Sequence, residues 1–111
     1  MVIKEITSEE LKNLNNEFTV VLFHAVWCAQ SKNLRFEINK IEDDTLNFLS
    51  FDIDKDINLS KELKINITPT LLIFKEKEIL GRRSDLWTKN KGVIKSNLII
   101  EWINSFRTEE V

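Results

Sequence analysis

The chemistry open to this chain centres on its single cysteine, Cys28, in the segment Trp27-Cys28-Ala29-Gln30-Ser31. One cysteine cannot form an internal disulfide or a cysteine-based zinc site. There is also only one histidine, His24, so we expect no protein-bound metal. Cys28 is therefore either a reactive thiol or a small buried apolar residue without chemistry.

The residues around Cys28 place it between a buried strand and an amphipathic helix. Residues 18–26 form a near-continuous apolar run, which is typical of a central strand buried on both faces. Residues 28–43 have helical spacing, with Leu34 and Ile38 on one face. Cys28 would then lie in the first turn of a helix, where unpaired backbone N–H groups and the helix dipole favour an anion. A cysteine in such a position can have a pKa of about 3.5–7.5, and the thiolate is the form that attacks disulfides.

The remaining pattern predicts an α/β fold with one mixed sheet. We expect strands at 2–6, 46–53, 71–74 and from 79 onward. We expect helices at 8–16 after a capping box that begins at Thr7, at 57–63, and at the C-terminus, where the apolar stripe is Leu98, Ile99, Trp102, Ile103 and Phe106. A βαβ half followed by a ββα half gives a mixed central sheet of about five strands, flanked by about four helices. The length of 111 residues suits a single domain over 1–111.

Composition and charge exclude several classes of function. The net charge of −2 and the pI near 5.5 argue against a nucleic-acid-binding protein. No stretch approaches the roughly 20 apolar residues that are needed to cross a bilayer. The mixed, charged first ten residues do not have the pattern of a signal peptide. We therefore expect a cytoplasmic protein that binds neither nucleic acid nor membrane and uses no cofactor.

Three motifs, in this order, resemble the thioredoxin family over nearly the whole chain. They are Phe-His-Ala-Val-Trp-Cys at 23–28, Phe-Asp-Ile-Asp at 51–54 and Ile-Thr-Pro-Thr at 67–70. The resemblance implies the thioredoxin fold, with Pro69 as a cis-proline against Cys28 and with the Thr68 backbone pairing to an extended substrate. The site residues that it implies are Cys28 and Ser31 for catalysis and Trp27, Ala29, Gln30, Thr68 and Pro69 for substrate binding. Pro69 also has a purely structural interpretation, as a rigid turn before a strand.

The sequence departs from the family at the positions that serve the second thiol. Ser31 stands where the family has its resolving cysteine, Leu22 where it has a buried aspartate, and Ser50 at about the place of that aspartate's lysine partner. A hydroxyl cannot form a disulfide, so reduction by two cysteines of one site is excluded, although Ser31 can hydrogen-bond the Cys28 thiolate. A Cys-to-Ser change engineered to trap substrates would leave the aspartate and the lysine in place. The three departures together therefore favour natural divergence.

Two functions of different classes remain open. In the first, Cys28 forms mixed disulfides with protein partners that carry thiols or disulfides, and a second thiol such as glutathione releases them. Whether such a chain is an enzyme stays open; if it is, the activity is monothiol disulfide exchange and not dithiol reduction. In the second, the chain is a non-catalytic interaction module, similar to the N-terminal thioredoxin-like domain of multidomain monothiol glutaredoxins, and a glutaredoxin domain would follow residue 111. We expect a monomer, and the reactivity of Cys28 at neutral pH separates the two functions.

Two further features surround the predicted site. About six extra residues in 87–95 lengthen the loop beside the expected substrate groove, and Trp87 there either contacts a partner or packs against the fold. His24 occupies a position that is often aromatic in the family. We expect it to be a hydrogen-bonded strand residue and not a catalytic base.

Overall fold

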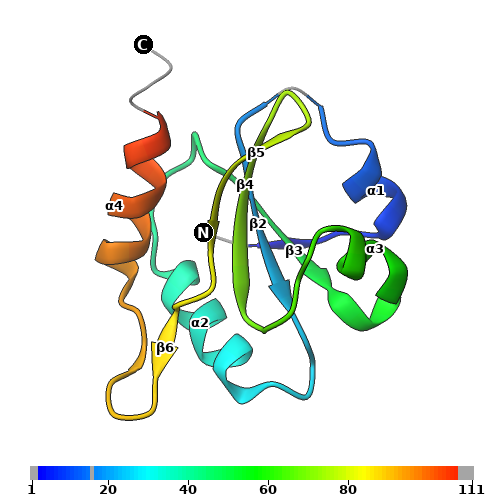
Figure 1. The fold of residues 1–111 in the computed structure, drawn as a ribbon. Helices are drawn as coiled ribbons and strands as arrows, with labels where there is room; N and C mark the ends of the chain where they lie inside the picture. The colour runs from blue at the N-terminus through cyan, green and yellow to red at the C-terminus, as the bar shows by residue number, and fades with distance from the viewer. Residues whose placement is uncertain (1–2, 16, 108–111) are drawn as a thin grey trace.

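The computed structural model describes residues 3–15 and 17–107, and strands and helices alternate through most of this length. In chain order the elements are β1 (Lys4–Glu5), α1 (Ser8–Lys12), β2 (Thr19–His24), α2 (Ala29–Asn39), β3 (Asn47–Asp52), the 3₁₀ helix η1 (Ile53–Lys55), α3 (Ile57–Glu62), β4 (Thr70–Lys75), β5 (Glu78–Arg83), β6 (Trp87–Thr88), β7 (Gly92–Val93) and α4 (Ser96–Arg107). The βαβ and ββα halves expected from the sequence are both present, and the predicted α/β class is confirmed (Figure 1).

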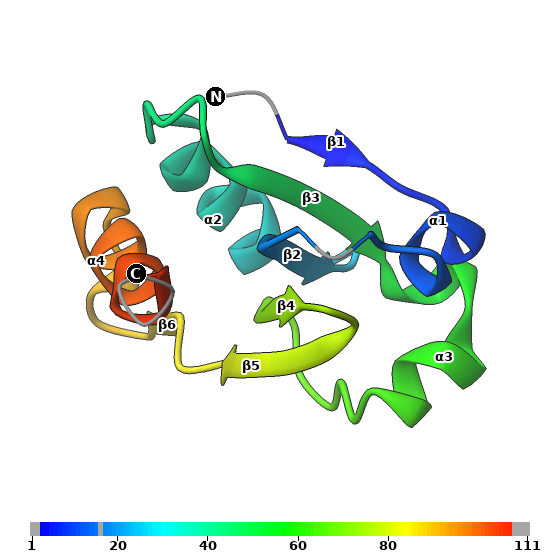
Figure 2. The same ribbon diagram turned by 90° about the horizontal axis from the view of Figure 1, so that it is seen from above.

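A five-stranded mixed sheet in the order β1-β3-β2-β4-β5 runs through the molecule. β2 is its central strand, because it pairs in parallel with β3 and antiparallel with β4. Helices α1 and α3 cover one face of this sheet, and α2 and α4 cover the other (Figures 1 and 2). Both faces of β2 are therefore buried, which explains its continuous apolar sequence.

Each face of the sheet has its own hydrophobic core. Under α2 and α4, apolar side chains of β2 and β4 pack against buried residues of both helices, among them Leu22, Leu71, Leu34, Ile38, Ile99 and Ile103. Under α1 and α3, the core includes Val21, Phe23, Phe51, Leu11 and Leu59. Burying a large apolar side chain contributes roughly 1.5–3 kcal/mol, so these two clusters hold the sheet and its helices together.

The helices begin where the sequence predicts but end earlier. The capping box is confirmed, since the Thr7 hydroxyl accepts a hydrogen bond from the Glu10 N–H and the Glu10 carboxylate accepts one from the Thr7 N–H. α1 ends at Lys12 and not near residue 16, because asparagines at 13, 15 and 16 favour helix less than other residues do. α2 ends at Asn39 and not at 43, although Ile41 is still buried. In the described part of the chain, no helix has the length and apolar character needed to cross a membrane.

The segment before α4 differs from the sequence-based expectation. Residues 87–95, expected as a loop, contain a small antiparallel hairpin of β6 and β7. In the C-terminal helix, Ile99 and Ile103 are buried as predicted, but the assignment of Leu98 to the apolar stripe is wrong. Leu98 is 48% exposed, because the stripe is centred on Ile99 and Ile103 and Leu98 lies beyond its edge.

Candidate functional site

Cys28 lies at the junction of β2 and α2, as the sequence predicts. It is the N-cap residue of α2 and has extended backbone angles, and its side chain makes no capping hydrogen bond. Its N–H donates to the Ala25 carbonyl at 3.0 Å, and its carbonyl accepts the first helical hydrogen bond from Lys32 at 3.4 Å. The Cys28 side chain therefore sits beside the unpaired N–H groups of the first turn of α2.

The sulfur of Cys28 is held between the first turn of α2 and the loop before β4. The thiol lies 3.6 Å from the carbonyl oxygen of Thr68 and 3.5 Å from Oε1 of Gln30, both of which can accept its hydrogen. The Thr68–Pro69 peptide bond is cis. The buried Thr70 hydroxyl donates to the Ile67 carbonyl at 2.6 Å and so holds this loop in place.

The surroundings of Cys28 favour its thiolate. Burial acts to raise the pKa of the Cys28 thiol, but the nearby Ser31 and Thr68 side chains and the Ser31 and Gln30 backbone act in the opposite direction. The balance places the pKa of Cys28 below its ordinary value. Ser31 is only 2% exposed, and its hydroxyl has no hydrogen-bond partner among the described residues. A thiolate at Cys28 would supply the acceptor that this hydroxyl lacks.

Cys28 opens into a groove of about 350 Å³ between the start of α2, η1 and the loop before β4. The groove is lined by uncharged residues, namely Trp27, Cys28, Gln30, Ile53, Ile65, Asn66, Ile67 and Thr68. Trp27 is 69% exposed and Ile67 is 49% exposed, so two large apolar side chains beside a nearly buried sulfur are open to solvent. An exposed apolar surface of this kind suits contact with another protein.

Trp27 is held in place in spite of its exposure. Its indole N–H donates to Oδ2 of Asp54 at 2.8 Å. The backbone N–H of Asp54 in turn donates to Oδ1 of Asp52 at 2.9 Å, which fixes the start of η1. This hydrogen bond sets the orientation of the indole at one side of the groove.

The structure brings together most of the site residues that the sequence predicts. Cys28, Ser31, Trp27, Gln30 and Thr68 meet at the groove or directly beneath it. Two others do not line it: Ala29 is exposed outside the groove, and Pro69 is buried behind Thr68.

Sequence reasoning missed four groove residues, Ile53, Ile65, Asn66 and Ile67. Three of them are isoleucines, and an apolar residue in a chain this rich in isoleucine carries no signal of a binding role. The sequence leaves open whether Trp87 packs against the fold or contacts a partner. In the structure Trp87 is half-buried and does not line the groove.

Two of the three replaced family positions, Leu22 and Ser50, lie side by side. Leu22 of β2 and Ser50 of β3 are direct neighbours across the parallel pair, and both are fully buried. Leu22 packs in the core under α2, so this position holds no proton donor or acceptor. Ser50 has instead become part of a polar cluster that sequence reasoning did not detect.

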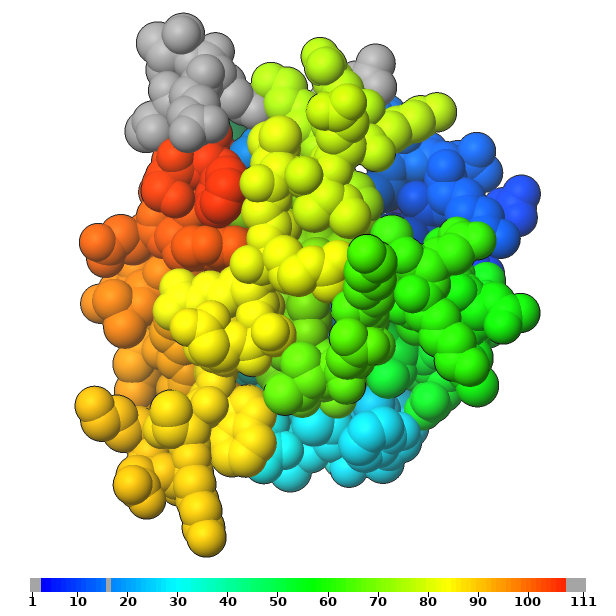
Figure 3. Space-filling model, in the orientation of Figure 1, coloured from blue at the N-terminus to red at the C-terminus, as the bar shows by residue number. Residues whose placement is uncertain are grey.

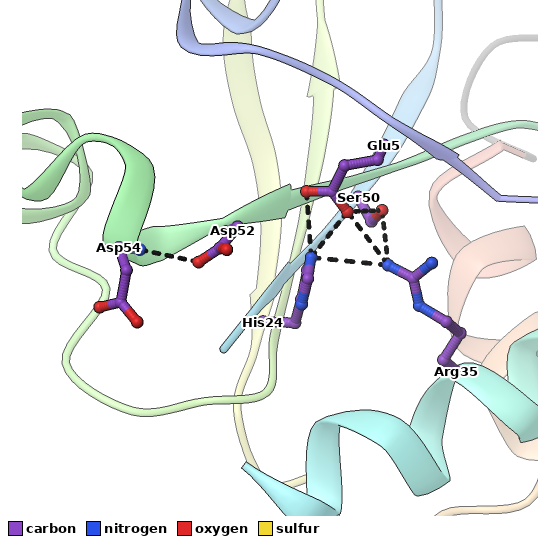
Figure 4. Close-up of polar contacts among 6 residues, drawn as sticks. All are labelled: Glu5, His24, Arg35, Ser50, Asp52 and Asp54. Atoms are coloured by element: carbon purple, nitrogen blue, oxygen red, sulfur yellow. Dashed lines mark hydrogen bonds and ion pairs between the residues drawn. The ribbon is translucent and has the colours of Figure 1, made fainter. Parts of the chain in front are cut away.

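That cluster joins β1, β2, β3 and α2 (Figure 4). The Glu5 carboxylate accepts hydrogen bonds from the Ser50 hydroxyl at 2.7 Å and from the Arg35 guanidinium at 3.2 Å, and it lies 2.7 Å from Nε2 of His24. Arg35 also donates to the Ser50 hydroxyl at 2.8 Å. Burial acts to raise the pKa of Glu5, but these contacts outweigh it and hold that pKa below its usual value. His24 is thus a hydrogen-bonded strand residue, as predicted.

Comparison with known proteins agrees with the fold. The thioredoxin family model matches residues 2–104. Thioredoxin of Rickettsia prowazekii (strain Madrid E) is 30% identical over 109 residues, which are 93% of this chain and 97% of that protein. Thioredoxin 2 of Plasmodium berghei (strain Anka) is 30% identical over 82 residues, and the match covers 71% of this chain but only 52% of that relative, about half its length.

Solved structures show the same fold. Chloroplastic thioredoxin z superposes with a TM-score of 0.75 at 24% identity, over 97% of this chain and 98% of that chain. The chain belongs to the thioredoxin family. Within that family it is a divergent, thioredoxin-like protein with a single cysteine.

Proposed function

We propose that this protein exchanges disulfides through Cys28 alone, as a monothiol thioredoxin-like protein. The Cys28 thiolate attacks one sulfur of a partner's disulfide, an S–S bond forms between Cys28 and that sulfur, and the second sulfur leaves as a thiolate. A second thiol, from glutathione or from the partner itself, then attacks the mixed disulfide. It takes the partner's sulfur into a new disulfide and releases Cys28 as a thiolate.

The observation that carries this proposal is the buried, unpaired Ser31 hydroxyl near Cys28. This hydroxyl has no hydrogen-bond partner among the described residues, and it acts to lower the pKa of the Cys28 thiol. A serine kept only for packing would be expected to hydrogen-bond elsewhere, because an unpaired buried hydroxyl costs about 1–3 kcal/mol. Ser31, at the position of the family's resolving cysteine, thus stabilises the Cys28 thiolate in this chain.

The lining of the groove favours proteins as the partners of Cys28. Its uncharged lining, the exposed Trp27 and Ile67 side chains and the Thr68 backbone suit an extended segment that lies across Cys28. We propose protein thiols and disulfides as substrates and glutathione as the releasing thiol. Since Cys28 must be regenerated as a thiolate, we propose the cytoplasm, a reducing compartment, as the site of action.

The test is the pH dependence of alkylation. The reaction of folded, reduced protein with iodoacetamide should have a midpoint below the value of about 8.5 of an ordinary thiol. The same protein in concentrated guanidinium chloride is the matched control and should show the ordinary midpoint. Equal midpoints in the folded and unfolded protein would contradict activation of Cys28. Mass spectrometry should also detect one glutathione on Cys28 after incubation with glutathione disulfide, and none on a Cys28→Ser variant.

A second candidate function is a non-catalytic interaction module, such as the N-terminal domain of a multidomain monothiol glutaredoxin. The burial of the sulfur favours it, since Cys28 is only 7% exposed while Trp27 and Ile67 beside it are open. In that case the groove would bind a partner without covalent capture. An ordinary alkylation midpoint, together with partner binding that survives the Cys28→Ser change, would select this function.

A further inference from the structure

The hairpin of β6 and β7 carries a strongly one-sided charge. Residues 86–100 contain Lys89, Lys91 and Lys95 and no aspartate or glutamate. The chain as a whole has a net charge of −2, so this is a local property of the segment. We refer to residues 87–95 as the basic hairpin.

Packing against α2 directs the basic hairpin toward the Cys28 end of that helix. β7 contacts α2, and Val93 and Ile94 pack against the core beneath α2 and α4. Lys95, at the base of the hairpin, is close enough to Glu37 of α2 to lower the pKa of that carboxyl. From there the hairpin extends toward the end of the molecule where α2 begins, so that its turn and the start of α2 lie at the same end (Figures 1 and 3).

Three lysines on this side of the groove carry charges that the fold does not neutralise. Lys32, in the first turn of α2, and Lys89 and Lys91, in the hairpin turn, are exposed and form no ion pair with any residue that the structure describes. Of the other two cations of these segments, Arg35 is paired with Glu5, and Lys95 is near Glu37 without forming an ion pair. Lys32, Lys89 and Lys91 thus leave positive charge that is not neutralised at the start of α2 and at the tip of the hairpin.

The other side of the groove has the opposite charge. Residues 52–56 at η1 contain Asp52 and Asp54, which form no ion pair with a described residue, and Asp56, which is paired with Lys12 at 3.9 Å; the only cation in this segment is Lys55. The start of α2 lies between this region and the basic hairpin (Figure 3). A partner segment that crosses the uncharged groove at Cys28 therefore passes from an acidic margin to a basic one.

We infer that the basic hairpin, together with Lys32, binds acidic residues that flank the reactive disulfide of a protein partner. This rests on the proposed function for the covalent step, because capture occurs through Cys28. The uncharged groove then supplies the contact around the sulfur, and the lysines select among partners by charge. An exposed ion pair typically changes an equilibrium or a rate by about 1.4- to 5-fold, so three free lysines are enough for a clear preference.

The experiment uses synthetic peptides with one cysteine, activated as the mixed disulfide with thionitrobenzoate. Three versions carry four Glu, four Gln or four Lys on one side of the cysteine, and each is made with the charged block N-terminal or C-terminal to it. Attack by Cys28 on the peptide sulfur releases thionitrobenzoate, whose absorbance reports the rate. The Glu peptide, in one of its two orientations, should react about 10-fold faster than the Lys peptide at low salt, and 0.5 M NaCl should reduce this ratio.

Two double variants distinguish the effect of the hairpin lysines from the effect of the protein's net charge. Lys89→Gln with Lys91→Gln should slow the Glu peptide by about 3- to 10-fold and leave the Gln peptide unchanged. The matched control, Lys61→Gln with Lys77→Gln, removes the same charge from α3 and from the β4–β5 turn and should leave all rates unchanged. Equal rates for the three peptides, or equal effects of the two double variants, would overturn the inference and leave exchange through Cys28 intact.

A second measurement keeps the inference independent of thiol chemistry. The same peptides with Ser in place of Cys bind without a covalent step, and amide NMR shifts report where they lie. The Glu peptide should shift the amides of the basic hairpin in the unmodified protein but not in the variant that lacks Lys89 and Lys91. If no peptide exchanged with Cys28 but these shifts were present, the proposed function would fail, and the basic hairpin would stand as a docking surface for acidic segments. If the hairpin amides did not shift, the inference would fail.

Discussion

Removal of the Ser31 hydroxyl tests most directly how Cys28 is activated. Ser31→Ala deletes one oxygen at a position that is 2% exposed and leaves the backbone of the first turn of α2 in place. A hydrogen bond to a charged group contributes about 1.5–3 kcal/mol, and one pKa unit corresponds to about 1.36 kcal/mol. We expect the pKa of Cys28 to rise by about one unit, the lower end of this range, since the Thr68 side chain and the backbone donors remain.

The expected change in rate is smaller than the change in thiolate fraction. At a pH below both midpoints, a rise of about one unit lowers the thiolate fraction about tenfold. A more basic thiolate is also a better nucleophile, with a Brønsted slope of about 0.4–0.5, which increases its rate about threefold. Alkylation of Ser31→Ala at such a pH should therefore be about threefold slower, while above pH 10 it should be faster than that of the unmodified protein. The midpoint of the pH profile is the decisive readout.

Stability supplies an independent check on the same substitution. The Ser31 hydroxyl is unpaired among the described residues, so at a pH at least one unit below the alkylation midpoint, where Cys28 is a thiol, Ser31→Ala should leave stability unchanged or raise it by about 1 kcal/mol. Ser60→Ala is the matched control. Ser60 is also buried, at 6% exposed, but its hydroxyl lies 3.2 and 3.0 Å from the carbonyl oxygens of Ile53 and Asp56, either of which can accept its hydrogen. The control should lose about 1 kcal/mol and keep the Cys28 midpoint. A Ser31→Ala protein with an unchanged midpoint and a loss of stability like that of the control would refute the assigned role of Ser31.

Three further predictions concern other parts of the fold. Ser31→Cys alone should restore little dithiol reductase activity in a stopped-flow assay with a protein disulfide. Adding Leu22→Asp should increase the rate, because acid–base assistance is typically worth about 10²–10⁴-fold; equal rates would show that a buried carboxylate is not what the site lacks. Asp43, with a pKa of about 2, contributes stability above pH 5 that is lost as the pH falls toward 2. Asp43→Asn should therefore cost about 1 kcal/mol at pH 7 in urea unfolding and nothing near pH 2. Glu76 and Lys77 have φ angles of 53° and 65°, so Glu76→Asn with Lys77→Gly should stabilise the β4–β5 turn by about 1 kcal/mol in the same assay, and a loss of stability would contradict this view of the turn.

Much of the site could be predicted from local sequence, because its determinants lie within a few residues of one another. The apolar run of β2 and the helical spacing after it placed Cys28 at a strand–helix junction, and the structure agrees. The lack of a second cysteine and the leucine at position 22 are properties of the sequence alone, and they exclude dithiol chemistry without reference to any contact. The capping box at Thr7 is equally local and was also predicted.

The tertiary structure decided which distant residues meet around these local elements. The Thr68 carbonyl reaches the sulfur of Cys28 across 40 residues of chain, and Ser50 reaches Glu5 across 45. Neither contact has a periodic signature, because each depends on the strand order β1-β3-β2-β4-β5, which places the ends of separate strands together. The direction of the basic hairpin is also decided by the tertiary structure. The sequence contains its lysines, but only the packing of Val93 and Ile94 against the core directs them toward the Cys28 end of α2.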